Sequence, residues 1–162
     1  MQGRFGPRRV HRLASVGGTE TSVAPVGPEA VARAYLDAFG TGDADVIAGY
    51  VAEDFVNEHT AALGAGCRGR DAYRVALGGF LADMVDLGYE VEDLVVDGDR
   101  VAAFYNMSAQ WQGATPISVR GVQRLVVRDD LIVHRTDYWD SAVFLLQADE
   151  RAPVALAPFG IS

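Results

Sequence analysis

The hydrophobic pattern of the chain changes its period near the middle, and this change limits the folds that the chain can adopt. Residues 89–96 and 100–111 each alternate apolar and polar side chains, as β-strands do. The two segments are separated by Asp97-Gly98-Asp99, and Asp-Gly between alternating segments is a strong hairpin signal. Residues 117–127 and 131–139 repeat the pattern. The second half of the chain therefore predicts an antiparallel meander.

The first half of the chain shows helical spacing instead. Pro28 opens a predicted helix whose apolar side chains recur on one face, at Val31, Tyr35, Ala38 and Phe39. Further helices are predicted over residues 43–50, 71–85 and 141–147, with Asp43 as an N-cap and a short strand over residues 53–59. Helices followed by an antiparallel sheet are typical of an α+β fold.

Length, charge and cysteine content narrow the class of protein. The 162 residues fit one domain, and the formal net charge of -8 argues against non-specific binding to nucleic acid. We expect a flexible Arg-rich tail over residues 1–27, the folded domain over 28–148 and a C-terminal tail over 149–162. Cys67 is the single cysteine, and no apolar run approaches the ~18 residues that cross a membrane, so we expect a cytoplasmic protein. The scattered histidines and the lack of a phosphate-binding glycine loop predict neither a metal nor a cofactor.

The last predicted strand carries the candidate chemistry. Alternation places one set of side chains on one face, namely Val133, Arg135, Asp137 and Trp139, and the other set opposite, namely Ile132, His134, Thr136 and Tyr138. One face therefore combines a carboxylate with a large indole. Burial against apolar surface raises the pKa of a carboxylate, and this suits a general acid or base. The alternative is that Asp137 is an ordinary exposed strand residue.

The order of these segments resembles the SnoaL-like branch of the nuclear-transport-factor-2-like superfamily. The resemblance is carried by residues 51–60, 69–73, 92–101, 120–122 and 137–140. It implies a cone-shaped, curved antiparallel sheet wrapped around about three helices, with an apolar pocket open at one end. The superfamily includes polyketide cyclases, ketosteroid isomerases, limonene-type epoxide hydrolases, dehydratases and members without catalytic activity, so the fold alone does not name a reaction.

The same resemblance assigns roles to particular positions. Asp137 matches the carboxylate with which limonene-type epoxide hydrolases help to activate water, and Asn57 and His59 match two further water ligands. Those hydrolases also carry an Arg-Asp pair on the central strand, where this chain has Tyr105 and Met107, which argues against a standard epoxide hydrolase. Ketosteroid isomerases place an uncharged residue where Asp137 stands, which weakens that assignment as well.

Two kinds of site residue follow from these observations. We predict that His59 and Asp137 act as a proton-transfer pair, with Tyr105 or Asn57 donating a hydrogen bond to a developing enolate oxygen. Pocket walls are predicted from apolar and aromatic side chains, for which a place in the core is the alternative: Trp139, Trp111, Phe55, Met107, Tyr35 and Phe39. Tyr50, Tyr73 and Tyr138 receive no functional role.

The sequence thus predicts a small enzyme that performs cofactor-free acid/base chemistry on an apolar, carbonyl-bearing molecule. Cyclisation or isomerisation of a polyketide-like substrate is the first hypothesis, and epoxide opening or hydration by a water that Asp137 activates is the second. A non-catalytic ligand-binding or dimerisation module is the third. We also predict a homodimer formed through the outer sheet face, with Val122, Leu125 and Val127 as its apolar surface.

Overall fold

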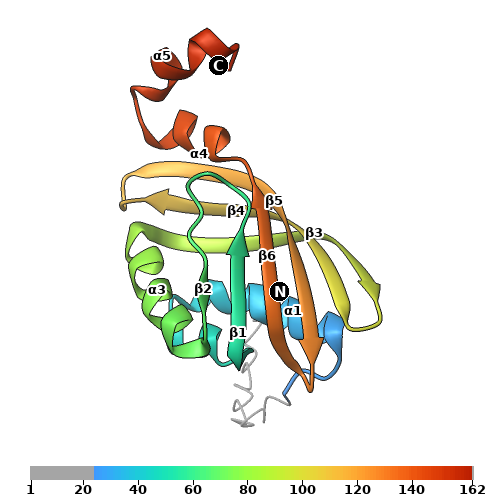
Figure 1. Ribbon diagram of the computed structural model, residues 1–162. Helices are drawn as coiled ribbons and strands as arrows, with labels where there is room; N and C mark the ends of the chain where they lie inside the picture. The colour runs from blue at the N-terminus through green and yellow to red at the C-terminus, as the bar shows by residue number, and fades with distance from the viewer. Residues whose placement is uncertain (1–23, 162) are drawn as a thin grey trace, which may run out of the picture.

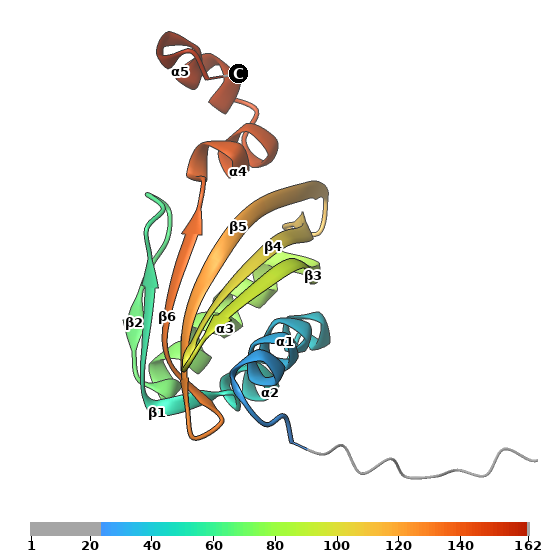
Figure 2. The ribbon, with the colours of Figure 1, turned by 90° about the vertical axis from the view of Figure 1, so that its right-hand side faces the viewer.

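A curved six-stranded sheet forms the body of the protein. The computed structural model describes residues 24–161. Residues 1–23 of the expected tail therefore lie outside the described residues. The strand order is β2-β1-β6-β5-β4-β3, and Figure 2 shows the sheet curving around the N-terminal helices. The strands are β1 (Val51–His59), β2 (Cys67–Arg68), β3 (Met84–Asp97), β4 (Arg100–Trp111), β5 (Thr115–Arg128) and β6 (Leu131–Trp139). The predicted α+β class is confirmed.

The pairing of β1 with β6 distinguishes this sheet from a simple meander. β3, β4, β5 and β6 follow one another as antiparallel neighbours, as the two hairpin patterns predict. β1 then adds to the free side of β6 in parallel, so the sheet is mixed. This pairing places His59 of β1 directly beside Asp137 of β6 in the strand register.

Three helices cover the concave side of the sheet (Figure 1), namely α1 (Pro28–Ala38), α2 (Ala44–Ala48) and α3 (Arg70–Asp83). A short 3₁₀ turn, η1 (Phe39–Thr41), follows α1. α1 begins at a proline and buries Tyr35 and Leu36 against the sheet. The predicted N-cap of α2 is confirmed, because the Asp43 carboxylate accepts hydrogen bonds from the backbone N–H groups of Asp45 and Val46 at 2.8 and 3.3 Å.

The boundary between α3 and β3 differs from the prediction. The helical spacing predicts a helix through residue 85, but α3 ends at Asp83 and β3 already begins at Met84. Met84 and Val85 pair with the last two residues of β4, after which the register shifts before Gly88. Pairing with a long neighbouring strand thus overrides the local helical period, and Asp86, with φ at 54°, lies in the irregular step.

Because β6 contains a β-bulge, the alternation of its side chains differs from the prediction at the start of the strand. Val127 pairs with Ile132, whereas Val126 pairs with His134, so Val133 is an extra residue in the ladder. Ile132 consequently faces the core and is 0% exposed, while Val133 turns to a groove on the outer face. Beyond the bulge the predicted face is recovered, and Arg135 and Asp137 point inward together.

The outer face of the sheet is less apolar than predicted. Leu125 and Val127 are 0% and 4% exposed and belong to the core, so they cannot contribute to an outer contact surface. Val122 does lie on the outer face, in register with Phe104 on β4 and Tyr138 on β6. These three side chains form a short apolar row, and the homodimer stays a prediction.

The chain continues beyond the sheet into short helices. α4 (Ser141–Ala148) agrees with the predicted helix over residues 141–147 and is capped by Asp140, which accepts a hydrogen bond from Ala142 N at 2.8 Å. α5 (Ala152–Leu156) and the 3₁₀ turn η2 (Ala157–Phe159) follow and project away from the sheet (Figure 1). None of the helices described here has both the length and the apolar character needed to span a bilayer.

Candidate active site

A cavity of about 540 Å³ lies between the concave face of the sheet and α3, with α4 beside it. Most of its wall is apolar or aromatic: Phe39, Leu63, Ala65, Ala76, Leu77, Phe80, Met84, Met107, Trp111, Val119, Trp139 and Phe144. A polar group is set into this wall, formed by Asn57, His59, Tyr73, Tyr89, Tyr105, Arg135 and Asp137. An apolar cavity with a few convergent polar groups is the usual form of a small-molecule site.

Most of the predicted site residues meet in this cavity. Asp137, His59, Asn57, Tyr105, Trp139, Trp111, Met107 and Phe39 all line it. Phe55 and Tyr35 instead lie in the core behind the cavity wall. The ring of Phe55 packs against that of Tyr73 at a centroid distance of 4.9 Å. Phe55 is thus a support for the wall, because an intervening ring covers it.

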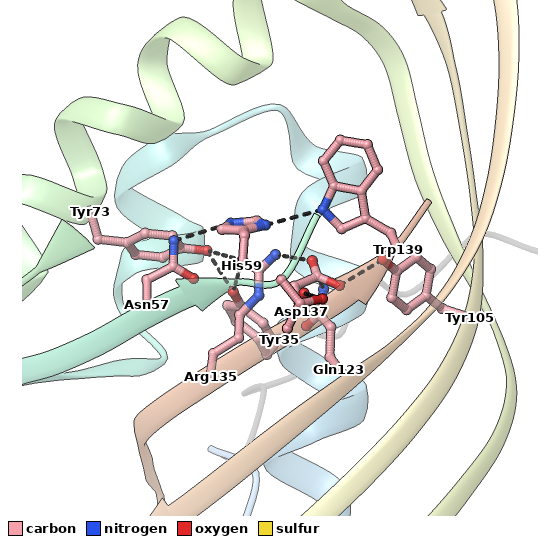
Figure 3. A network of polar contacts seen from close by, with 10 residues as sticks. Tyr35, Asn57, His59, Tyr73, Tyr105, Gln123, Arg135, Asp137 and Trp139 are labelled. Atoms are coloured by element: carbon pink, nitrogen blue, oxygen red, sulfur yellow. Dashed lines mark hydrogen bonds and ion pairs between the residues drawn. The ribbon is translucent and has the colours of Figure 1, made fainter. Parts of the chain in front are cut away.

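Asp137 is the buried carboxylate of the cavity. It is 3% exposed and accepts hydrogen bonds on both oxygens (Figure 3). The Tyr105 hydroxyl donates to Oδ1 at 2.7 Å, while Oδ2 accepts from Arg135 Nη2 and, at 3.4 Å, from Gln123 Nε2. Arg135 compensates the charge of the carboxylate, which makes burial of the charged form tolerable.

Arg135 connects the carboxylate with the helices. It stands two positions before Asp137 on β6, so both side chains point to the same face. Its Nη1 donates to the hydroxyl of Tyr35 on α1 at 3.0 Å and to that of Tyr73 on α3 at 3.2 Å. The two phenol oxygens are themselves 2.5 Å apart. One guanidinium therefore joins two helices to the polar group in the cavity.

His59 is held as a neutral ring. Its pKa is lowered from 6.5 to about 4, mainly by burial and secondly by the positive charge of Arg135. The negative charge of Asp137 acts in the opposite direction and raises this pKa. The indole Nε1–H of Trp139 donates to Nδ1 of His59 at 3.2 Å. Because an indole N–H can only donate, Nδ1 carries no proton, and the neutral ring has its hydrogen on Nε2.

Asn57 lies on the other side of this ring. Its Nδ2 is 3.4 Å from Nε2 of His59, and its buried Oδ1 has no partner among residues 24–161. The amide rotamer turned by 180° exchanges these two atoms and gives the Nε2–H of His59 an acceptor. In that arrangement both ring nitrogens are bonded, and His59 orients Trp139 and Asn57.

The predicted proton-transfer pair is therefore arranged differently from the expectation. His59 and Asp137 line the same cavity from neighbouring strands. Within the described part of the chain, however, no direct hydrogen bond joins them, since Arg135 occupies the carboxylate and Trp139 the imidazole. A cation forms the stronger, charge-assisted bond with a carboxylate, which explains the preference.

Tyr105 is positioned by a glycine on the next strand. Tyr105 and Gly121 are register partners on β4 and β5, and a Cβ atom at position 121 would lie 2.4 Å from the phenol oxygen. Only glycine leaves room for the ring in this position. Burial, and next the nearby Asp137 carboxylate, raise the pKa of Tyr105, so its hydroxyl remains protonated. Its one hydrogen is donated to Asp137 and is not free for a ligand.

Sequence reasoning did not identify Arg135, Gln123, Tyr73 and Tyr89 as site residues. Arg135 could have been found, because alternation already placed it on the face of Asp137. Gln123 pairs in register with Asp137, and this requires knowledge of the strand pairing. Tyr73 receives no functional role from the sequence, and its hydroxyl contact with Arg135 is visible only in three dimensions. Among the residues described, no cluster of three or more His, Cys, Asp or Glu side chains is suited to a metal ion.

The sequence and this geometry agree with one family. The SnoaL-like domain matches residues 32–135 of the chain. This protein belongs to the SnoaL-like family. No curated protein gives a significant match to its sequence. The predicted family is thereby confirmed, while the reaction is a separate question because the family is chemically diverse.

Solved structures of other proteins share the fold of this SnoaL-like protein. A protein of ketosteroid isomerase-like fold from Catenulispora acidiphila, in complex with trimethylamine, has a TM-score of 0.70 and 21% identity over 76% of this chain and 95% of its own. A candidate SnoaL-like polyketide cyclase from Jannaschia has a TM-score of 0.67 and 14% identity, with 82% and 99% coverage. A limonene-epoxide-hydrolase-like enzyme from M. tuberculosis has a TM-score of 0.61 and 21% identity, with 79% and 92% coverage. The predicted fold is confirmed by these likenesses.

Proposed function

We propose that this SnoaL-like protein is an enzyme that transfers protons on an apolar, carbonyl-bearing small molecule without a cofactor. Cyclisation or isomerisation through an enolate is the reaction that we favour. The observation that carries this proposal is the position of Asp137, a buried carboxylate on the wall of a cavity of about 540 Å³. A base enclosed in an apolar cavity is shielded from bulk water, so it can act on a weakly acidic C–H bond.

The proposed step uses the residues as they stand. The Asp137 carboxylate takes a proton from the carbon next to a carbonyl group and becomes a carboxylic acid. The electron pair of the broken C–H bond forms the enolate double bond, and the carbonyl π pair moves to oxygen. The enolate carbon then attacks a second carbonyl carbon of the same molecule, the π pair of that carbonyl moves to its oxygen, and this oxygen takes the proton from Asp137. In an isomerisation the enolate is conjugated with a neighbouring C=C bond, and the remote carbon of that system takes the proton from Asp137 instead. Arg135 stays cationic throughout and remains close to the transferred negative charge.

His59 takes a supporting role in this proposal. With a pKa of about 4 it is neutral at physiological pH. Its Nδ1 is occupied by the Trp139 indole, and its Nε2–H faces Asn57. A base needs a free lone pair, so Asp137 rather than His59 is the proton acceptor. His59 fixes the orientation of Trp139, which forms part of the substrate wall.

Deuterium exchange tests the proposal without knowledge of the natural substrate. Apolar β-diketones and cyclic ketones are incubated in D2O, and loss of their α-proton NMR signals is compared with and without protein. We expect acceleration by the unmodified protein and a decrease of about 10²-fold or more in Asp137→Asn. Asp129→Asn, on the exposed turn between β5 and β6, is the matched control. Equal exchange by all three proteins would contradict the proposal.

Epoxide opening is the second candidate function, and one observation favours it. Gln123 Oε1 is a buried acceptor without a partner among residues 24–161, and Gln123 Nε2 lies 3.4 Å from Asp137 Oδ2, so this acceptor suits a water molecule beside the carboxylate. Limonene oxide incubated in H2¹⁸O should then give a labelled diol with the unmodified protein but not with Asp137→Asn. Binding of ketones or epoxides without exchange or diol would instead identify a non-catalytic binding module.

A further inference from the structure

Two tyrosines that have no role in the proposed reaction form a buried cluster with Arg135. Tyr35 comes from α1, Tyr73 from α3 and Arg135 from β6 (Figure 3). Arg135 Nη1 lies 3.0 Å from the Tyr35 oxygen and 3.2 Å from the Tyr73 oxygen, and the two oxygens are 2.5 Å apart. These three contacts determine how the hydrogens of the cluster can be distributed.

Counting hydrogens shows that one hydroxyl has a free donor. Arg135 is always a donor, so each phenol oxygen accepts one N–H from it. A single hydrogen lies between the two phenol oxygens, which means that one tyrosine donates and the other accepts. Burial raises the pKa of both phenols, so each keeps its hydrogen. The accepting tyrosine therefore retains an O–H for which the described residues supply no acceptor.

The position of the two rings decides which tyrosine this is. Tyr35 is 0% exposed and lies behind the cavity wall. Tyr73 is 2% exposed, but unlike Tyr35 it lines the cavity. A free O–H on Tyr35 would be stranded in the core and would lose its hydration without compensation. A free O–H on Tyr73 can turn toward a ligand. The arrangement that leaves no stranded donor is Tyr35 donating to Tyr73, with the Tyr73 hydrogen directed into the cavity.

We propose that Tyr73 donates the hydrogen bond that binds the carbonyl or enolate oxygen of the substrate. This inference rests on the proposed function, and it replaces Tyr105 in the predicted role of donor, because the hydrogen of Tyr105 is already used by Asp137. In this arrangement of hydrogens the Tyr73 oxygen accepts from Arg135 and from Tyr35, which lies 2.5 Å away. Hydrogen bonds in such a chain polarise one another, which makes the terminal O–H a stronger donor.

The location of Tyr73 also defines the kind of substrate. Arg135 contacts Tyr73 through Nη1 and Asp137 through Nη2, so donor and base lie at the two ends of one guanidinium. A carbonyl oxygen on Tyr73 therefore places the neighbouring carbon toward Asp137. This arrangement fits a ketone or ester with an acidic hydrogen on the adjacent carbon. Tyr73 keeps its proton in the reaction and stabilises the negative charge that develops on oxygen.

Binding of 4-nitrophenol tests the donor directly. Its phenolate carries a negative oxygen on an apolar ring, as an enolate does, and its absorbance reports both binding and ionisation. We expect Tyr73→Phe to weaken phenolate binding about tenfold or more, because a hydrogen bond to a charged oxygen is lost. Tyr35→Phe should weaken it less, since Tyr73 keeps its bond from Arg135. Tyr138→Phe, on the outer sheet face, is the matched control.

Several outcomes would overturn the inference. These are equal losses in Tyr35→Phe and Tyr73→Phe, unchanged binding in Tyr73→Phe, or the absence of 4-nitrophenol binding to the unmodified protein. If either core variant fails to fold, the unmodified protein still decides the question. It should bind 4-nitrophenolate about tenfold more tightly than nitrobenzene, which lacks the oxyanion, and equal affinities would refute a donor. Because binding requires no turnover, this test can fail or succeed independently of the exchange test for the proposed function.

Discussion

Arg135 and Asp137 stand two residues apart on β6 and form an ion pair inside the protein, with side-chain exposures of 5% and 4%. Their immediate neighbours on the strand point to the opposite face, so the pair projects toward the cavity and the helices, as Trp139 does two positions further on. The pair has two consequences. It places a guanidinium beside a buried carboxylate among apolar walls, and it ties the position of that carboxylate to two tyrosines on different helices.

Removal of the cation should destabilise the protein strongly. Arg135→Met leaves the buried Asp137 carboxylate without compensation, and we expect a loss of about 3–5 kcal/mol in the free energy of unfolding, measured with urea. Arg128→Met removes an arginine from an exposed pair with Asp99 and should cost less than about 1 kcal/mol. Similar small losses in both variants would show that the buried pair does not contribute as its geometry indicates.

His59 should make stability depend on pH in a defined window. Its pKa is about 4 in the folded protein against 6.5 as the ordinary value, so between these two values the unfolded chain binds more protons. The free energy of unfolding therefore rises with pH through this window, and the contribution is lost as pH falls from about 6.5 to about 4. His59→Gln should flatten the pH dependence there relative to the unmodified protein. An unchanged slope would contradict the burial of a neutral ring.

Gly121 should be intolerant of a side chain. A Cβ atom at this position would lie 2.4 Å from the Tyr105 oxygen and 2.7 Å from the backbone oxygen of Tyr138. We expect Gly121→Ala to cost about 1–3 kcal/mol of stability through overpacking. It should also displace Tyr105 from Asp137 and reduce the exchange activity. Gly88→Ala is the control, because nothing lies within 4 Å of a Cβ atom there. Equal melting temperatures of the two variants would refute the close approach.

Phe144 should limit the length of the ligand. Its ring lies 5.1 Å from that of Trp111 and 6.2 Å from that of Trp139, and all three line the cavity. Phe144→Ala enlarges this end of the cavity, so affinity should shift toward longer phenols and ketones, as measured by fluorescence titration. The stability loss should stay below the 3–5 kcal/mol typical of a fully buried phenylalanine. Val143→Ala, which alters an exposed residue of the same helix, should leave the preference unchanged.

The predicted homodimer can be tested at the apolar row of the outer sheet face. Light scattering at micromolar concentration should give about twice the 17.3 kDa of one chain. Val122 stands at the centre of the row, between Phe104 and Tyr138, so Val122→Arg should shift the mass toward the monomer. Arg100→Met, at the start of β4 and away from the row, should leave the mass unchanged. A monomeric mass for the unmodified protein would end this prediction.

The sequence by itself determined the class of fold and most of its longer elements. The Asp97-Gly98 turn and the flanking alternation placed β3 and β4 side by side, and the bounds predicted for β4 and β6 agree with the structure. Asp43 was recognised as a cap from its position before a helical pattern. Such features depend on neighbours within a few residues, which a sequence displays directly.

Tertiary structure alone decided which groups meet. Tyr35 and Arg135 are separated by 100 residues along the chain and are nevertheless hydrogen-bonded. The bulge at Val133 and the early start of β3 at Met84 arise from pairing with neighbouring strands. Alternation groups the side chains of a strand into two faces, but it does not say which face is buried or which residue lies opposite. Those facts depend on contacts between distant segments, and for this reason Arg135 rather than His59 became the partner of Asp137.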